Sequence, residues 1–322
     1  MALGMLVKGK WLTEREQEDS KGHFLRPQTT FRNWVTADGS SGFQAEANRY
    51  HLYISWACPW AHRTALMRRL KGLEEAITLS VVDPYMGEEG WAFSEGPGCI
   101  PDPIFSAQFL REIYVKADSH YTGRVTVPIL WDKKTNTIVN NESREIMRMF
   151  DLEFDAFAKS KVNFFPKKLQ EVIEPTIEVI YKPINNGVYR AGFATTQKAY
   201  EEAVIELFKA LDYWEAALGE QRYLCGSKIT EADWCMFTTL LRFDLVYYSH
   251  FKCNLRRIFD YPNLWNYLKD LYQQPGVKET CNFEHIKQHY YKSHEKINPT
   301  RIVPKGPLID FGAPHNRDRM KK

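Results

Sequence analysis

The alternation of apolar and polar residues changes near residue 46. Residues 1–46 are polar and rich in Gly and Ser, so we expect an extended N-terminal segment. A run of aromatic and β-branched residues predicts a strand over 50–55. Pro59 suits the first turn of a helix, which the apolar pattern continues over 61–70. A second strand over 77–82 completes a βαβ unit, which predicts a parallel strand pair with a right-handed crossover.

The elements that follow define the fold class of this first half. A Gly- and Pro-rich loop is expected over 83–103, followed by a helix over 106–117. Strands over 125–131 and 137–140 predict a hairpin, and a helix is expected over 142–150. The order strand–helix–strand, helix, hairpin, helix is typical of a thioredoxin-like domain.

The second half has a helical period throughout. Thr230 and Asp233 predict a capped helix start, and residues 285–320 are expected to form an irregular extension. One helix face is marked by Ala203, Val204, Leu207, Phe208, Leu211, Trp214 and Leu218.

Together these patterns predict an α/β domain followed by an all-α domain. The expected ranges are an N-terminal extension over 1–46, a thioredoxin-like domain over 47–155, and an all-α domain with an irregular C-terminal extension over 156–322. A length of 322 residues agrees with about two domains.

Composition excludes several classes of protein. The 43 basic and 40 acidic residues are interspersed, so we expect no nucleic-acid partner. The basic C-terminal tail is interpreted as a solvated end and contains Arg317, Arg319, Lys321 and Lys322. The longest stretch without charge runs from Tyr50 to His62, thirteen residues, whereas a membrane-spanning helix needs about 20. The first residues lack the pattern of a signal peptide.

Cysteine usage favours a reducing, cytoplasmic location. The chain has six cysteines, at 58, 99, 225, 235, 253 and 281, without a C-x-x-C pair or the spacing of a disulfide framework or zinc site. The last four lie in the helical half and are interpreted as packing residues.

Cys58 is the strongest candidate for chemistry. It lies between a predicted strand and a helix that starts with Pro59, where free N–H groups and the helix dipole favour a thiolate. The residue three places on is Ala61, so a mixed disulfide on Cys58 needs an external thiol. The alternative is a buried structural cysteine.

Two further features accompany this cysteine. Pro128 falls inside a predicted strand, where a cis Val127–Pro128 bond would expose the backbone of Val127 to an extended peptide; an edge strand or bulge is the alternative. Glu142 and Ser143 start a predicted helix, where they suit a carboxylate or an α-ammonium group. Plain N-capping is the alternative use of this pair.

Taken together, these features describe a site for a thiol tripeptide. The segments C-P-W-A-H-R at 58–63, T-V-P at 126–128 and N-E-S at 141–143 resemble the glutathione site of cysteine-type glutathione transferases. Longer blocks resemble the glutathionyl-hydroquinone reductases, or Xi-class transferases: F-R-N-W-V-T-A-D-G at 31–39, G-R-V-T-V-P-I-L-W-D-K-K at 123–134, N-N-G-V-Y-R-A-G-F-A-T at 185–195, R-F-D-L-V-Y at 242–247, H-F-K-C at 250–253 and H-Y-Y-K-S-H-E-K-I-N-P-T at 289–300.

The resemblance implies a role for each matching residue. Cys58 matches the catalytic cysteine, and Tyr189 and Tyr290 match two tyrosines of the quinone pocket. A shift of one place in the match to the family would assign this role to Tyr291 instead of Tyr290. The glutathione contacts that it implies are Trp91, Val127, Glu142 and Ser143. Without the resemblance, both tyrosines are ordinary packing residues.

The implied activity is reduction of S-glutathionyl-hydroquinones with glutathione as co-substrate, in a homodimer. The alternatives are a general thioltransferase or dehydroascorbate reductase, and a non-catalytic ligand-binding scaffold. Three histidines lie close together in the sequence, at 285, 289 and 294, and the first two are four residues apart, a spacing that suits a metal pair. No Glu follows His285 and no nearby Cys completes a ligand set, so we expect no metal.

Overall fold

The computed structural model describes residues 4–13 and 18–320. Its contacts group the chain into two compact units. Unit 1 comprises residues 1–16, 28–162 and 279–303, and unit 2 comprises 17–27, 163–278 and 304–322. The units are interleaved along the sequence, whereas the predicted domains are continuous ranges.

A mixed sheet forms the centre of unit 1. Its strand order is β6 (Ile77–Val81), β5 (Tyr50–Ile54), β8 (Ile129–Asp132) and β9 (Thr137–Asn140). β5 pairs in parallel with β6, as the βαβ pattern predicts, and β8 pairs antiparallel with both β5 and β9.

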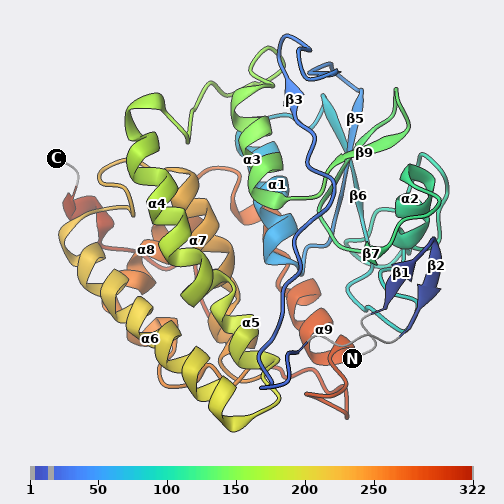
Figure 1. Ribbon diagram of the computed structural model, residues 1–322. Helices are drawn as coiled ribbons and strands as arrows, with labels where there is room; N and C mark the ends of the chain where they lie inside the picture. Colours follow the sequence, from blue (N-terminus) through green and yellow to red (C-terminus); the bar gives the residue numbers. More distant parts are fainter. Residues whose placement is uncertain (1–3, 14–17, 321–322) are drawn as a thin grey trace. The chain divides into compact units, whose positions relative to one another are not determined.

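Helices α1 (Pro59–Leu70) and α3 (Ser143–Leu152) pack against each other beside this sheet (Figure 1). Pro59 occupies the first turn of α1, as predicted. The thioredoxin-like order of elements is therefore confirmed.

Two predicted elements start later than the sequence indicates. Helix α2 (Leu110–Ala117) begins four residues after its predicted start at Ser106. Ser106 has a φ of 52°, which is not helical, and the backbone N–H groups of residues 104, 105 and 107 donate to the Asp102 carboxylate instead of forming a helical turn. Pro128 precedes β8 and does not lie inside it, so the expected start of this strand at 125 is wrong.

The N-terminal segment contains short strands that were not predicted. These are β1 (Met5–Val7), β2 (Lys10–Leu12), β3 (Val35–Thr36) and β4 (Phe43–Gln44). β1 pairs with β2 and with β7 (Gly123–Arg124), forming the order β2-β1-β7. Strands of two or three residues are too short for a period-2 pattern to stand out.

Unit 2 consists mainly of helices. Its α-helices are α4 (Gln170–Ile180), α5 (Gly187–Gly192), α6 (Gln197–Glu220), α7 (Glu231–Arg242) and α8 (Pro262–Tyr272). All seven residues of the predicted apolar face of α6 are buried, and Thr230 and Asp233 form the predicted capping box of α7.

The C-terminal region differs from its prediction in two respects. Residues 283–293 form helix α9 (Phe283–Ser293), which belongs to unit 1, although an irregular extension was expected from residue 285. Arg317 is fully buried and donates to the carbonyls of Leu218, Gln221 and Arg222. The prediction of a solvated tail is therefore wrong for Arg317, while residues 321 and 322 lie outside the described part.

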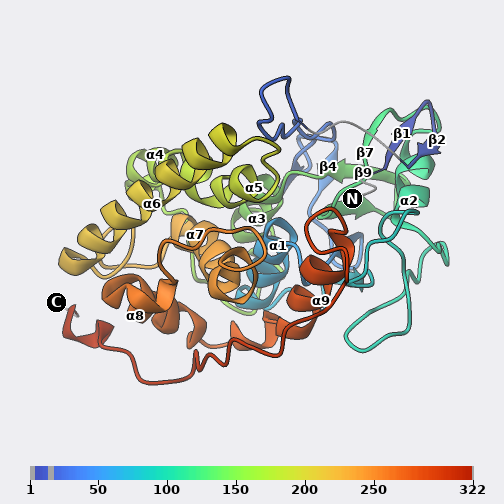
Figure 2. The ribbon, with the colours of Figure 1, turned by 90° about the horizontal axis from the view of Figure 1, so that it is seen from below.

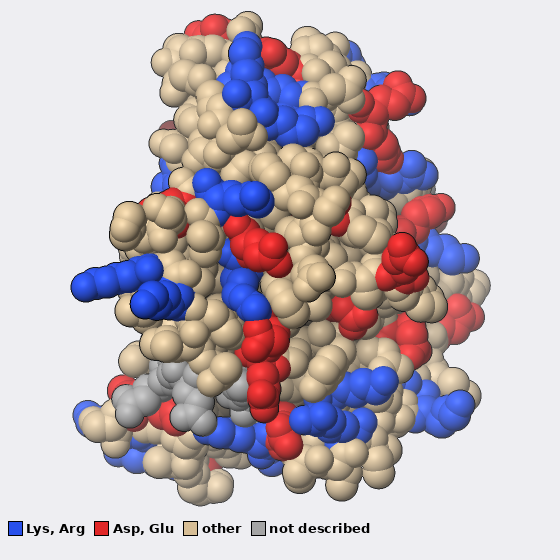
Figure 3. All heavy atoms as spheres, turned by 90° about the vertical axis from the view of Figure 1, so that its right-hand side faces the viewer, with Lys and Arg blue, Asp and Glu red and all other residues tan. Residues whose placement is uncertain are grey.

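The described part of the chain contains no helix with both the length and the apolar character needed to span a bilayer. Figure 3 shows positive and negative side chains near one another on one face of the molecule. Ion pairs between surface side chains, such as Lys134–Glu46 at 3.1 Å, reflect this mixing.

Candidate active site

Strand topology brings four sequence features to one end of the sheet of unit 1. Cys58 follows β5, and the loop with Trp91 follows the parallel strand β6. Val127 precedes β8, which runs antiparallel to β5, and Glu142 follows β9, which runs antiparallel to β8. Because antiparallel neighbours place the end of one strand beside the start of the next, these segments share one edge of the sheet.

Cys58 is the N-cap residue of α1. Its thiol is half-buried, and Sγ lies 3.7 Å from the carbonyl oxygen of Val127, to which it donates. The Val127–Pro128 peptide bond is cis, as one of the two alternatives predicted. The first turn of α1 contains no acidic residue, so no carboxylate there opposes the positive end of the helix dipole, which stabilises negative charge at this position.

Glu142 and Ser143 form the start of α3. Glu142 is the N-cap, and its carboxylate accepts hydrogen bonds from the backbone N–H of Arg144 and from the hydroxyl of Thr29, both at 3.3 Å. The Ser143 hydroxyl donates to the same carboxylate at 3.4 Å and is buried. The pair therefore does cap a helix, and it also places a carboxylate and a hydroxyl at the shared sheet edge.

Trp91 and Tyr290 lie in neighbouring parts of unit 1. Trp91 is buried in the loop after β6, and its ring stacks on His289 of α9, with ring centres 4.7 Å apart. The next residue, Tyr290, is 1% exposed and meets the His289 ring edge-on at 5.3 Å. Tyr291 is also buried, but the contact with His289 links Tyr290 to Trp91.

Tyr189 belongs to unit 2, on α5. Its hydroxyl lies 3.4 Å from the hydroxyl of Tyr247, and its ring packs edge-on against Tyr247 and Phe251. The guanidinium of Arg26 lies 4.9 Å from the centre of the same ring, and its Nε donates to Asn186 at 2.6 Å. Tyr189 is thus a buried aromatic residue with a cation beside it.

The remaining cysteines differ from Cys58 in their surroundings. All six cysteines are free thiols. Burial raises the pKa of Cys99, Cys225 and Cys253, which keeps these three as protonated thiols with little nucleophilic character.

The histidines of α9 bond to carbonyl groups. His285 bonds to the carbonyl of Pro97 at 2.7 Å, and His289 bonds to that of Pro84 at 3.0 Å. Among residues 4–13 and 18–320, no three His, Cys, Asp or Glu side chains form a cluster that could hold a metal ion.

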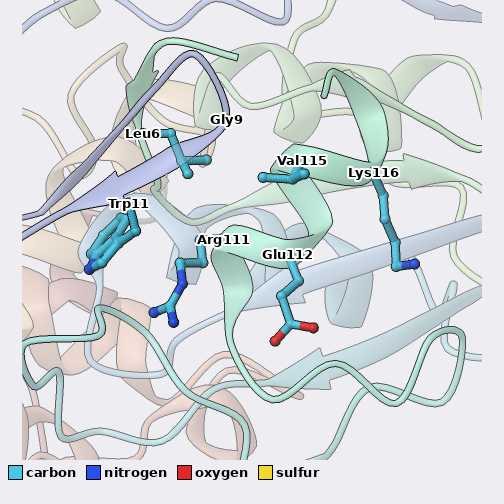
Figure 4. Close-up of a pocket in the computed structure, with 7 residues that line it drawn as sticks. All are labelled: Leu6, Gly9, Trp11, Arg111, Glu112, Val115 and Lys116. Carbon is cyan, nitrogen blue, oxygen red and sulfur yellow. The ribbon is translucent and has the colours of Figure 1, made fainter. Parts of the chain in front are cut away.

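A groove of about 300 Å³ lies elsewhere in unit 1, between the β1–β2 hairpin and α2 (Figure 4). None of the predicted site residues lines it. Its Arg111 side chain pairs with Glu89, and its Glu112 carboxylate accepts from the backbone N–H groups of Gln108 and Phe109. Because these charged groups already have partners, the groove is not a second candidate for chemistry.

Sequence reasoning missed Thr29, His289 and Arg26. Thr29 contacts Glu142, His289 contacts Trp91, and Arg26 contacts Tyr189. His289 was weighed only as a metal ligand, although its position directly before Tyr290 was a usable signal. Thr29 and Arg26 lie more than 100 residues from their partners in the sequence, and no local pattern predicts such contacts.

Comparisons with known proteins agree with this geometry. The family model for the glutathione S-transferase N-terminal domain matches residues 57–153, and the model for the C-terminal domain matches residues 197–270.

Two curated relatives match nearly the full chain. Glutathionyl-hydroquinone reductase YqjG of Escherichia coli is 52% identical, covering 98% of this chain and 99% of that protein. Glutathionyl-hydroquinone reductase PcpF of Sphingobium chlorophenolicum is 48% identical, covering 95% of this chain and 96% of that protein.

Solved structures give the same result. A Xi-class transferase from Natrialba magadii superposes with a TM-score of 0.94 at 56% identity, covering 99% of this chain and 98% of that one. The glutathione-bound structure of Escherichia coli YqjG superposes with a TM-score of 0.90 at 51% identity, covering 98% of this chain and 99% of that one. The chain therefore belongs to the glutathione transferase superfamily, in the Xi-class family of glutathionyl-hydroquinone reductases.

Proposed function

We propose that this protein reduces S-glutathionyl-hydroquinones to hydroquinones, with glutathione as co-substrate and Cys58 as the nucleophile. The observation that carries the proposal is the Cys58 thiol at the start of α1, 3.7 Å from the Val127 carbonyl. The names of two relatives, each about half identical over nearly the whole chain, support the same reaction.

Glutathione binding is assigned to the shared sheet edge. The backbone of Val127, which precedes β8 at this edge, pairs with the extended tripeptide. Glu142 receives the α-ammonium of the γ-glutamyl group. The Ser143 hydroxyl, which donates to Glu142 at 3.4 Å, turns to the α-carboxylate of that group when the tripeptide binds. Trp91 packs against the bound tripeptide. The hydrogen bonds from Thr29 and Arg144 fix the Glu142 carboxylate in place.

The chemistry proceeds in two exchanges at sulfur. The Cys58 thiolate attacks the glutathione sulfur of the substrate, and the bond between that sulfur and the aromatic carbon breaks. The carbon keeps the electron pair and takes a proton, which releases the hydroquinone. A second glutathione thiolate then attacks the Cys58–glutathione disulfide, which yields glutathione disulfide and regenerates the Cys58 thiolate. Ala61 offers no internal thiol for this step.

Tyr189 and Tyr290 are assigned to the aromatic part of the substrate. A phenol hydroxyl can hold a phenolic oxygen or deliver the proton that the aromatic carbon takes. The buried surroundings of both tyrosines suit this role, because a hydrogen bond is stronger where water is excluded.

The proposal is tested by steady-state turnover of glutathionyl-menadiol, with menadiol release followed by chromatography. We expect Cys58→Ser to abolish release, whereas Cys281→Ser, which removes another half-buried thiol, keeps it. Unchanged turnover in Cys58→Ser would overturn the proposal. Parallel assays with dehydroascorbate and with a small disulfide test the thioltransferase alternative, which predicts faster turnover of those substrates. The ligand-carrier alternative predicts binding without turnover.

We also propose that the protein works as a homodimer in the reducing cytoplasm. Six free thiols agree with a reducing compartment. Val172 and Val179 are about half exposed on α4, one heptad apart, and present an apolar stripe that a second copy can cover. Light scattering after gel filtration should give twice the chain mass of 37.7 kDa; a monomer mass at micromolar concentration would contradict the dimer.

A further inference from the structure

Helix α9 directs three side chains from one face toward the loop that carries Trp91. His285, His289 and Ser293 are spaced by four residues, so they lie on the same side of the helix. His285 bonds to the carbonyl of Pro97, and His289 bonds to the carbonyl of Pro84. The Ser293 hydroxyl accepts from the backbone N–H of Met86 at 2.9 Å. Figure 2 shows α9 beside this loop. The helix therefore holds the loop on both sides of Trp91.

His289 also contacts the Trp91 side chain itself. The two rings are nearly parallel, with an angle of 22° and a centre-to-centre distance of 4.7 Å. Each side chain is 7% exposed. The carbonyl of Trp91 accepts from the backbone N–H of Leu110 at 2.9 Å, so the backbone is fixed on one side and the indole ring on the other.

The orientation of the imidazole is itself set by its neighbours. The Pro84 carbonyl can only accept, so Nδ1 of His289 carries the hydrogen. The rings of Tyr290 and His294 meet the imidazole edge-on at 5.3 Å each. The Ser293 hydroxyl also lies 3.3 Å from Nδ1. These polar contacts and the aromatic neighbours leave the imidazole little freedom to rotate, and it presents a flat face to Trp91.

We propose that His289 is a positioning residue that holds the Trp91 indole in the orientation in which it contacts glutathione. The proposal rests on the assignment of Trp91 to the glutathione site under the proposed function. His289 acts through the Trp91 indole ring, and it has no assigned contact with the reacting sulfur atoms.

The test measures glutathione affinity by calorimetry in the Cys58→Ser background, where no turnover occurs. His289→Asn keeps a side-chain donor for Pro84 but removes the stacked ring. A stacked aromatic pair contributes about 0.5–1.5 kcal/mol, which corresponds to a loss of affinity of about two- to twelvefold. His289→Phe keeps a flat ring, so we expect its affinity to stay within about twofold of the parent protein.

A double variant that combines Trp91→Ala with His289→Asn separates a positioning role of His289 from a general structural effect. If His289 acts through Trp91, His289→Asn changes nothing further in a Trp91→Ala protein. His285→Asn is the matched control, because His285 holds the same loop through Pro97 whereas the ring stacked on Trp91 is that of His289. We expect His285→Asn to leave the affinity for glutathione unchanged. Thermal unfolding of each variant confirms that the protein is folded before affinity is compared.

Each other outcome refutes a specific statement. If Trp91→Ala leaves glutathione affinity unchanged, the glutathione role of Trp91 fails, and the proposal for His289 fails with it. If Trp91→Ala weakens binding but His289→Asn does not, only the positioning role fails. The positioning role is also overturned if the two substitutions are additive, if His285→Asn weakens binding equally, or if His289→Phe loses as much affinity as His289→Asn.

Discussion

Replacing Glu142 by Gln removes one negative charge at the start of α3 while keeping the shape of the side chain. The carboxylate now accepts from the Thr29 hydroxyl and the Arg144 N–H, both at 3.3 Å. An amide oxygen can still accept one of these bonds, so α3 keeps its cap. The loss of charge near the helix N-terminus costs about 0.3–1 kcal/mol of stability, which a chain of this size tolerates.

The cost to glutathione binding should be larger. A hydrogen bond to a charged group contributes about 1.5–3 kcal/mol, and about 1.4 kcal/mol is a tenfold change in affinity, so Glu142→Gln should weaken glutathione binding about 12- to 140-fold. Calorimetry in the Cys58→Ser background measures this value directly. A glutathione analogue without the α-amino group should bind the parent protein more weakly than glutathione does, by a similar factor. Its affinity should not fall further when Glu142 is replaced by Gln.

Glu145→Gln is the control for this prediction. Glu145 lies in the first turn of the same helix, but its carboxylate pairs with Arg32 and with Asn140. The substitution removes an equal charge from the same turn without touching the proposed ammonium site, so affinity should change by less than about twofold. If Glu142→Gln also changes affinity by less than twofold, or if Glu145→Gln weakens binding equally, the assignment of the α-ammonium to Glu142 is wrong.

Two other predictions concern stability and the N-terminal segment. Lys71 is buried. Its ammonium lies 3.4 Å from the buried carboxylate of Asp151 and bonds to the carbonyls of Asp151 and Val162 at 2.8 and 2.7 Å. Lys71→Met should therefore lower the free energy of unfolding by about 3–5 kcal/mol, and an unchanged urea midpoint would contradict this reasoning. The carboxylates of Glu202 and then Asp19 accept hydrogen bonds from the His23 ring, which raises the pKa of His23 above its ordinary value of 6.5. The stabilisation that charged His23 gains from these two carboxylates is complete below pH 6.5, and it is lost as the pH rises through the raised pKa of His23. Amide exchange of the segment around His23, corrected for the intrinsic effect of pH, should show falling protection over that window, and Glu202→Gln should reduce the change. Protection that stays constant over this pH range would refute the stabilising role of the charged His23.

Local signals in the sequence predicted the elements that build the sheet edge. The aromatic and β-branched run of β5 and the proline at the start of α1 located Cys58 between them, as the structure shows. Pro128 signalled an unusual backbone next to β8, and the bond before it is cis. These predictions succeed because strand propensity, helix starts and proline geometry depend on neighbouring residues.

Contacts between distant segments were not predictable in the same way. The pairing of α9 with the loop around Trp91 joins residues about 200 positions apart. The burial of Arg317 depends on three carbonyl groups about 95 positions earlier in the chain. Charge and composition indicated a solvated tail there, because a single-sequence pattern does not show which backbone acceptors a guanidinium meets after folding.

The central claim is that the Cys58 thiolate takes the glutathionyl group from the substrate and releases the hydroquinone. Intact-mass spectrometry of the reduced protein, mixed with glutathionyl-menadiol in the absence of free glutathione, tests this step in one turnover. The account predicts a mass gain of one glutathione, mapped to Cys58, with an equal amount of menadiol released. A folded, reduced protein that gains no glutathione and releases no menadiol would contradict it.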